Sequence, residues 1–179
     1  MRLIKYFFLV VVCVLCSCTK QNTENTAISS VKEIANVLVQ KKQIELNPLK
    51  GQWFYEQQPF NGYAVVYHEN DNLVEKIGFL NGKREGTYYR YFTDGAIKSE
   101  GYYVQNKLHG IKLNYFKNGN VFSESNYVNG QRHGLQKTWF LNGQLAKKKN
   151  LSKGREEGLQ QAWLANGKIL SLIHISEPT

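Results

Sequence analysis

The chain has 179 residues and a formal net charge of +9, and 42% of its residues are hydrophobic. Its three cysteines, Cys13, Cys16 and Cys18, all lie near the N-terminus, so the chain from Thr19 onward can form neither a disulfide nor a thiolate metal site. The sequence has no H-E-x-x-H motif, no phosphate-cradling loop and no Ser/His/Asp arrangement. We therefore expect no enzymatic activity, no cofactor and no bound metal.

The N-terminal segment has the features of a lipoprotein signal peptide. Two basic residues precede an apolar run, residues 6–15, which is too short to span a bilayer but fits a secretory signal core. The next residues resemble a bacterial lipobox: Leu15, Cys16, Ser17 and Cys18. This resemblance implies that residues 1–17 are removed and that Cys18 receives the lipid. The alternatives are an ordinary signal peptide and an uncleaved anchor.

Lipidation of Cys18 would attach the protein to a bacterial cell envelope. Thr19 is not Asp, which by analogy with enteric bacteria favours the outer membrane over the inner membrane. A basic chain with interleaved aromatics can bind nucleic acid, but an exported lipoprotein seldom meets any. We therefore expect no nucleic-acid partner, and assign the charge to anionic headgroups or an acidic partner.

Residues 18–27 are polar and are predicted to form a tether. Apolar residues then follow helical spacing, and Ser30 to Glu33 has the form of a capping box. This pattern predicts one short helix from about Ser30 to Lys42, within an N-terminal cap of residues 28–48. Its apolar stripe either covers the first edge of a sheet or binds a partner or membrane, and edge cover is the preferred interpretation.

Residues 49–169 carry a pattern with a period of 24 residues. Glycines mark the period at Gly62, Gly86, Gly110, Gly134 and Gly158. Five residues after each stands a large aromatic: Tyr67, Tyr91, Tyr115, Trp139 and Trp163. A glycine preceded by Asn or Asp follows in four copies, at Gly95, Gly119, Gly143 and Gly167. A fixed period of this size predicts an array of stacked supersecondary units.

Each unit is predicted to be a β-hairpin. Asn-Gly and Asp-Gly supply the positive φ that tight hairpin turns require, and their flanks are rich in Tyr, Phe, Val and Ile. We expect all the repeat glycines to serve at turns. Aromatic residues directly after the aromatic column, such as Phe92, break the strand alternation and suggest a bulge or a second covered face. Residues 49–62 keep the period in part and are expected to supply the first strand of the array.

The pattern G-x-x-x-x-[YW]-F-x-[ND]-G, followed by an aliphatic residue and N-G-x-x-x-G, resembles the bacterial variant of the MORN repeat. Long arrays of this variant are often labelled YwqK-family antitoxins. The resemblance covers about residues 51–169 and implies an all-β repeat fold, an elongated, twisted, single-layer antiparallel sheet of tandem hairpins. It also implies attachment to proteins or membranes.

Two sets of side chains are candidate binding residues. The aromatic column of Tyr67, Tyr91, Tyr115, Trp139 and Trp163 could stack sugar rings, but is preferred as the sheet's own covering layer. The dense basic run comprises Lys147, Lys148, Lys149, Lys153 and Arg155. It could bind an anionic surface, although a solvated loop and edge that discourages aggregation is preferred.

Residues 170–179 depart from the repeat and resemble the translation of a transposase-based sequencing adapter. We therefore expect this segment to be an artefact, the alternative being a genuine apolar strand. Either way, His174 and Glu177 carry no functional weight.

Three functions remain open at this stage. The first and preferred function is a non-enzymatic, envelope-anchored scaffold that binds another protein or a membrane surface. The second is a YwqK-like antitoxin or immunity protein, whose toxin would have to act outside the cytosol. The third is a cell-wall glycan binder that uses the aromatic column.

Overall fold

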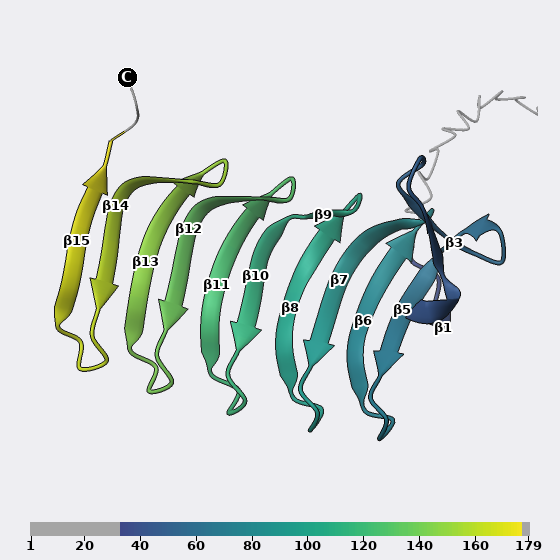
Figure 1. Ribbon diagram of the computed structural model, residues 1–179, viewed down its shortest axis with the longest axis horizontal. Coiled ribbons are helices and arrows are strands. Elements are labelled where there is room, and N and C mark those ends of the chain that lie inside the picture. The colour runs from purple at the N-terminus through teal and green to yellow at the C-terminus, as the bar shows by residue number, and fades with distance from the viewer. Residues whose placement is uncertain (1–32, 177–179) are drawn as a thin grey trace, which may run out of the picture. The chain divides into compact units, whose positions relative to one another are not determined.

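The computed structural model describes residues 33–176, which form a 12-stranded sheet and a 3-stranded sheet (Figure 1). The large sheet contains β1 (Leu38–Gln40), β5 (Gly62–Tyr67), β6 (Leu73–Leu80), β7 (Lys83–Tyr91), β8 (Ile97–Val104), β9 (Lys107–Leu108), β10 (Gly110–Tyr115), β11 (Val121–Val128), β12 (Gln131–Trp139), β13 (Leu145–Ser152), β14 (Arg155–Trp163) and β15 (Ile169–Ile175). The small sheet contains β2 (Glu45–Asn47), β3 (Gln52–Tyr55) and β4 (Gln58–Pro59). The predicted all-β repeat fold is confirmed.

From β5 onward each long strand pairs antiparallel with the next in the chain, and the short β9 pairs with β8. Figure 1 shows these strands in one row, each joined to its neighbour by a short connection. Each 24-residue period therefore supplies two strands and two chain reversals. Such an array buries each hairpin against its neighbours in sequence.

The first reversal of each period is built around an Asn or Asp before a glycine. In the turn after β7, the Gly95 N–H donates to the Phe92 carbonyl at 3.0 Å, and the Ala96 N–H donates to Asp94 Oδ1 at 3.1 Å. Gly95 has a φ of +86°. The same Asx hydrogen bond recurs at Asn118, Asn142 and Asn166. These turns confirm the prediction for Gly95, Gly119, Gly143 and Gly167.

The second reversal is a two-residue turn with positive φ at both positions. Between β11 and β12, Val128 pairs with Gln131, and Asn129 and Gly130 have φ values of +52° and +84°. Positive φ at both central residues is typical of a type I′ turn, whose twist matches that of the flanking strands. Asn and Gly tolerate this conformation best, which explains why Asn-Gly recurs there. The equivalent turns lie at residues 81–82, 105–106 and 153–154.

The other repeat glycines do not lie at chain reversals, so the prediction was wrong for Gly62, Gly86, Gly110, Gly134 and Gly158. Gly62 and Gly110 begin strands, and the other three lie inside β7, β12 and β14. In β12, Ser125 pairs with Gln136 and Tyr127 with Arg132, so the strand carries extra residues around Gly134. Gly134 has a φ of +72° there, which makes it a bulge glycine.

Glutamines two residues after Gly134 and Gly158 hold those two bulges in place. Gln160 Nε2 donates to the carbonyl oxygens of Glu157 at 2.8 Å and of Gly158 and Asn150 at 3.3 Å each. Gln136, one period earlier, donates in the same way to the carbonyls of Gly134 and Asn126. The side-chain amide thus donates to carbonyls around the bulge, where the register shift interrupts the ladder.

The predicted helix at residues 30–42 is absent from its described part. Residues 38–40 instead form β1, which pairs parallel with β5, and a 3-10 helix of three residues, Lys41–Gln43, follows. In β1 only Val39 is buried, between two exposed neighbours, which is the two-residue alternation of a strand. The unpaired edge of β5 outweighs helical propensity here, and the expected edge cover is made by strand pairing.

Residues 49–61 do not join the array as its first strand. They contribute β3 and β4 to the small sheet, where the Trp53 N–H donates to the Gly82 carbonyl at 2.6 Å. The small sheet and the first repeats enclose the apolar core: Val39, Ile44, Phe60, Ala64, Ile77, Phe79 and Tyr88. The large sheet is therefore covered at its N-terminal end, which corrects the prediction of a single layer throughout.

At the other end, β15 pairs antiparallel with β14, and Trp163 lies opposite Ile169 as in the earlier periods. Residues 170–175 therefore continue the sheet pattern. The proposed origin of residues 170–179 in an adapter sequence stays a prediction.

Candidate functional site

The aromatic column lies on one face of the large sheet, which we call the aromatic face. Each member is the last residue of its strand and pairs with an aliphatic residue across the turn, as Tyr91 does with Ile97 and Trp139 with Leu145. A register shift precedes each of them, and the extra residue lies on the partner strand, at Lys98 opposite Arg90 and Tyr91 and at Ala146 opposite Thr138 and Trp139. Tyr67 is 44% exposed. The other four are half-buried: Tyr91, Tyr115, Trp139 and Trp163.

Polar neighbours engage two members of the column. The Tyr115 hydroxyl donates to Glu100 at 2.5 Å, and burial together with this carboxylate raises the pKa of Tyr115 to about 12. The Lys137 ammonium lies 5.9 Å from the Trp139 ring centroid and 3.1 Å from Glu124. Glu100 and Glu124 thus contact different partners, and do not form a carboxylate pair.

The opposite face, which we call the serine face, carries small and polar residues in its middle. Two rows cross the strands there, since cross-strand partners share a face. One row runs through Asn114, Ser123, Thr138 and Lys147, and the next through Lys112, Ser125, Gln136 and Lys149. The small serines stand between longer side chains and so leave space above them.

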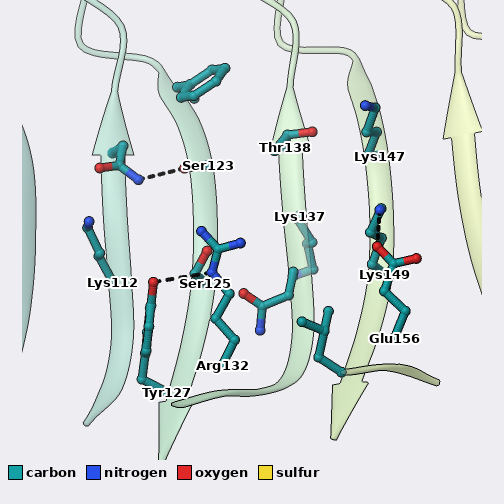
Figure 2. Close-up of a pocket in the computed structure, with 14 residues that line it drawn as sticks. Lys112, Ser123, Ser125, Tyr127, Arg132, Lys137, Thr138, Lys147, Lys149 and Glu156 are labelled. Carbon is teal, nitrogen blue, oxygen red and sulfur yellow. Dashed lines mark hydrogen bonds and ion pairs between the residues drawn. The ribbon is translucent and has the colours of Figure 1, made fainter. Parts of the chain in front are cut away.

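This space is a hollow of about 400 Å³ over β10 to β13. Ser123 and Ser125 lie beneath it and are only 7% and 9% exposed. Figure 2 shows cationic side chains from β10, β12 and β13 around it. Its lining consists of Lys112, Asn114, Phe122, Ser123, Ser125, Tyr127, Arg132, Gln136, Lys137, Thr138, Lys147, Lys149, Leu151 and Glu156.

The lining is strongly cationic. Of its five basic residues, Lys137 extends its ammonium to the aromatic face, where it pairs with Glu124, and Lys149 pairs with Glu156 on the serine face. The other three, Lys112, Arg132 and Lys147, have no carboxylate within 4.0 Å among the described residues. Arg132 Nε donates to the Tyr127 hydroxyl at 3.3 Å, which holds the guanidinium beside the hollow.

The basic run predicted from sequence does not form one patch. Lys147, Lys148 and Lys149 lie in β13, an interior strand, and not in a loop or edge as expected. Strand alternation places Lys147 and Lys149 on the serine face and Lys148 on the aromatic face. Lys153 lies in the following turn and Arg155 begins β14.

Lys112 and Arg132 were missed because they are isolated in the sequence. The signal that could have found them is the period itself. Lys147 and Lys149 stand where the preceding repeat has Ser123 and Ser125, and Lys112 stands where the next repeat has Gln136. Aligning the repeats on their 24-residue period therefore shows the positions at which a cation replaces a small or neutral residue.

The positive charge is concentrated in the same repeats. Residues 107–156 contain ten lysines and arginines against two glutamates, whereas residues 33–106 contain eight basic and nine acidic residues. The N-terminal repeats are thus close to neutral, and the field of the described chain comes mainly from β9 to β14.

Within residues 33–176, no group of three His, Cys, Asp or Glu side chains is placed to hold a metal. No helix in that range is long and apolar enough to cross a membrane. The lipobox residues and Cys18 lie outside the described residues, as does the proposed tether.

A family model described as MORN repeat variant matches residues 84–105, 108–129 and 132–152. The chain is similar to this repeat over three stretches, each about one period long. The matches begin at Arg84, Leu108 and Arg132, so each contains one first-type turn and ends close to the next two-residue turn. The resemblance stated from sequence is confirmed over these stretches, and all lining residues of the hollow except Glu156 lie in the second and third of them.

No curated protein matches the chain. Among solved structures, a TarM variant of S. aureus in complex with Fondaparinux, alpha-GlcNAc-glycerol and UDP matches with 16% identity and a TM-score of 0.35, over 65% of this chain and 21% of that one. The accessory secretory protein 1, 2 and 3 structure from Streptococcus pneumoniae matches with 17% identity and a TM-score of 0.34, over 73% of this chain and 23% of that one. The chain spans less than a quarter of either solved chain.

Proposed function

We propose that this protein is a non-enzymatic scaffold, anchored in a bacterial envelope through lipidated Cys18, that binds another protein or a membrane surface. The observation that carries the proposal is that successive MORN-variant repeats place equivalent side chains in columns on both faces of one sheet. Equivalent residues lie two strands apart, or about 10 Å. An extended partner therefore meets similar contacts at each repeat, and its affinity is the sum of many modest interactions.

The experiment uses photo-crosslinking residues in the full chain, expressed in a bacterium that processes lipoproteins. Thr138 and Trp139 are adjacent in β12 and point to opposite faces, so they report separately on the serine face and the aromatic face. Leu141, 58% exposed in the following turn, is the control position. We expect discrete adducts from at least one face position and none from Leu141. Adducts from neither face, or equally from all three positions, would contradict a sheet-face scaffold.

Anchoring is tested with Cys18→Ala. Loss of the thiol that would be lipidated should move the chain from the membrane fraction to the soluble fraction, because no acyl chain then holds it in the bilayer. Fractionation of outer and inner membranes then checks the proposed outer-membrane location. A Cys18→Ala chain that stays in the membrane would contradict lipidation.

Glycan binding is a second candidate, favoured by the incomplete burial of Tyr67 and of the two tryptophans of the column. Aromatic faces of this kind stack on sugar rings. Sacculus pull-down that is lost in a Trp139→Ala, Trp163→Ala double variant would select this function. An antitoxin or immunity role, implied by the family resemblance, would instead require an adjacent toxin gene that kills cells lacking this chain.

A further inference from the structure

The charge, size and orientation of the hollow on the serine face restrict the kind of partner that fits it. On the serine face it is lined by four cations, Lys112, Arg132, Lys147 and Lys149, and by the Glu156 carboxylate, and it lies where the chain's positive charge is concentrated. Because three of those cations lack a carboxylate partner among the described residues, an anionic ligand would gain contacts without displacing existing ion pairs.

We infer that this hollow, on β10 to β13, binds an extended acidic segment of a partner protein. The inference rests on the scaffold function proposed above and names the chemistry of its partner. The row from Lys112 through Ser125 and Gln136 to Lys149 crosses three strand spacings, or about 14 Å. In an extended peptide, residues i and i+4 lie about 14 Å apart on the same side. Carboxylates at that spacing reach the unpaired Lys112 at one end of the row and, at the other, β13, where the unpaired Lys147 stands two residues before Lys149 on the same face.

The chemistry of the lining favours a peptide over a pure polyanion. Side-chain amides of Asn114 and Gln136 and hydroxyls of Ser125 and Thr138 accompany the cations, and Glu156 adds a carboxylate. A peptide backbone presents both N–H donors and carbonyl acceptors to such a mixed lining. A polyphosphate presents acceptors only, and would be repelled by Glu156.

Two other occupants fit less well. The cations surround a hollow whose serine floor is buried, whereas a bilayer surface is flat on this scale. A second copy of the chain would bring a net charge of +9 toward a cationic surface. The acidic peptide is the occupant that charge and shape favour together.

The test is fluorescence anisotropy with a labelled peptide of about eleven residues that alternates Glu and Ser, added to the full chain in detergent at about 0.1 M salt. A variant of the hollow, which we call the groove variant, carries the substitutions Lys112→Gln, Lys147→Ser and Lys149→Ser. Each new residue already occupies the same column in another repeat, at Gln136, Ser123 and Ser125, so the variant is expected to fold. The control variant, Lys117→Thr, Lys148→Gln, Lys153→Asn, removes the same charge from turns and the aromatic face.

We expect the groove variant to bind the peptide about tenfold or more weakly than the unchanged chain. The control variant should stay within about threefold, since screened distant charges act weakly. Circular dichroism of both variants checks that the sheet is intact. Equal losses in the two variants, or no binding of the peptide by the unchanged chain, would overturn the inference.

Two further probes separate the alternative occupants. Vesicles containing phosphatidylglycerol and inorganic polyphosphate are each offered to the same three chains. Tighter binding of either probe than of the peptide, lost in the groove variant, would overturn the peptide assignment in favour of that ligand. The scaffold proposal is tested independently, because crosslinking from Trp139 can succeed even if the hollow binds no acidic peptide.

Discussion

Glu75 is a buried carboxylate whose two ion pairs contribute to the stability of the fold. It is 6% exposed, in β6, and accepts from Lys41 Nζ at 2.5 Å and from Arg90 Nε at 2.9 Å. Burial alone would raise the pKa of Glu75, but the hydrogen bonds and charges of Lys41 and Arg90 outweigh it and lower that pKa below its ordinary value of 4.5. The ion pair joins the N-terminal cap to the first repeat.

A lowered pKa predicts a pH-dependent stability. The contribution of Glu75 is fully present above its unfolded-state value of 4.5 and is lost as pH falls through the lower folded-state pKa. We expect Glu75→Gln to cost about 1–3 kcal/mol in the free energy of unfolding at neutral pH, because two cations lose their partner. Urea titrations at neutral pH and at acidic pH measure both effects.

The control is Glu156→Gln, whose partner Lys149 lies on an exposed surface. It should change the stability by less than about 0.5 kcal/mol. The difference between the Glu75→Gln chain and the unchanged chain should also shrink as pH falls below 4.5. A constant difference at every pH would show that Glu75 acts by packing and not by charge.

Single residues of the site were only partly predictable. The aromatic column was found because its spacing of 24 residues is visible in the sequence. Lys112 and Arg132 were missed because each has neutral neighbours, and only strand pairing brings them beside Lys147 and Lys149. Local charge density identified a run of three lysines that strand alternation divides between two faces.

At the scale of the element, two kinds of glycine perform different tasks at the same backbone angle. Gly82, in the two-residue turn before β7, and Gly134, in the bulge of β12, both have a φ of +72°. A Cβ at Gly82 would lie 2.6 Å from the Trp53 carbonyl oxygen, whereas a Cβ at Gly134 would meet no atom within 4 Å. The turn glycine thus also permits the small sheet to pack closely.

These two sites give a matched prediction. Gly134→Ala should cost about 1–2 kcal/mol, the backbone strain of a left-handed conformation. Gly82→Ala should cost about 1–3 kcal/mol more, since the backbone of Trp53 must also shift. Urea unfolding of the two variants measures the difference. Equal costs would mean that the small sheet is not held against the Gly82 turn.

Hairpins were predicted well and the N-terminal elements poorly, for one physical reason. Asn-Gly and Asp-Gly set turn geometry locally, so sequence alone locates those reversals. Residues 38–40 become a strand because the edge of β5 offers backbone partners, and that edge is a tertiary feature. The bulges at Gly86, Gly134 and Gly158 likewise depend on the register of the opposite strand, which no local pattern shows.

At the scale of the described chain, an array of this kind is stabilised by contacts between neighbouring repeats. Its stability is then close to a sum over units and their interfaces. The small sheet and the first repeats enclose the apolar core, and the later repeats are held by cross-strand pairs, by turns and by the hydrogen bonds of Gln136 and Gln160. The distribution of charge follows the same division. The repeats beside the apolar core are nearly neutral, and the later repeats are basic.

The central claim, that one 24-residue hairpin is the unit of the fold, is tested most directly by excising a unit. Deleting residues 110–133 joins His109 to Gly134 and so restores the His-Gly step that begins each of these repeats. We expect this chain to keep its β-sheet circular dichroism and to unfold in urea with an m-value about one sixth lower, in proportion to the surface removed. The matched control deletes residues 110–132, one residue fewer, which turns downstream side chains to the opposite face. A folded 24-residue deletion beside an unfolded or aggregated 23-residue deletion is the predicted result, and equal behaviour of the two chains would contradict the account.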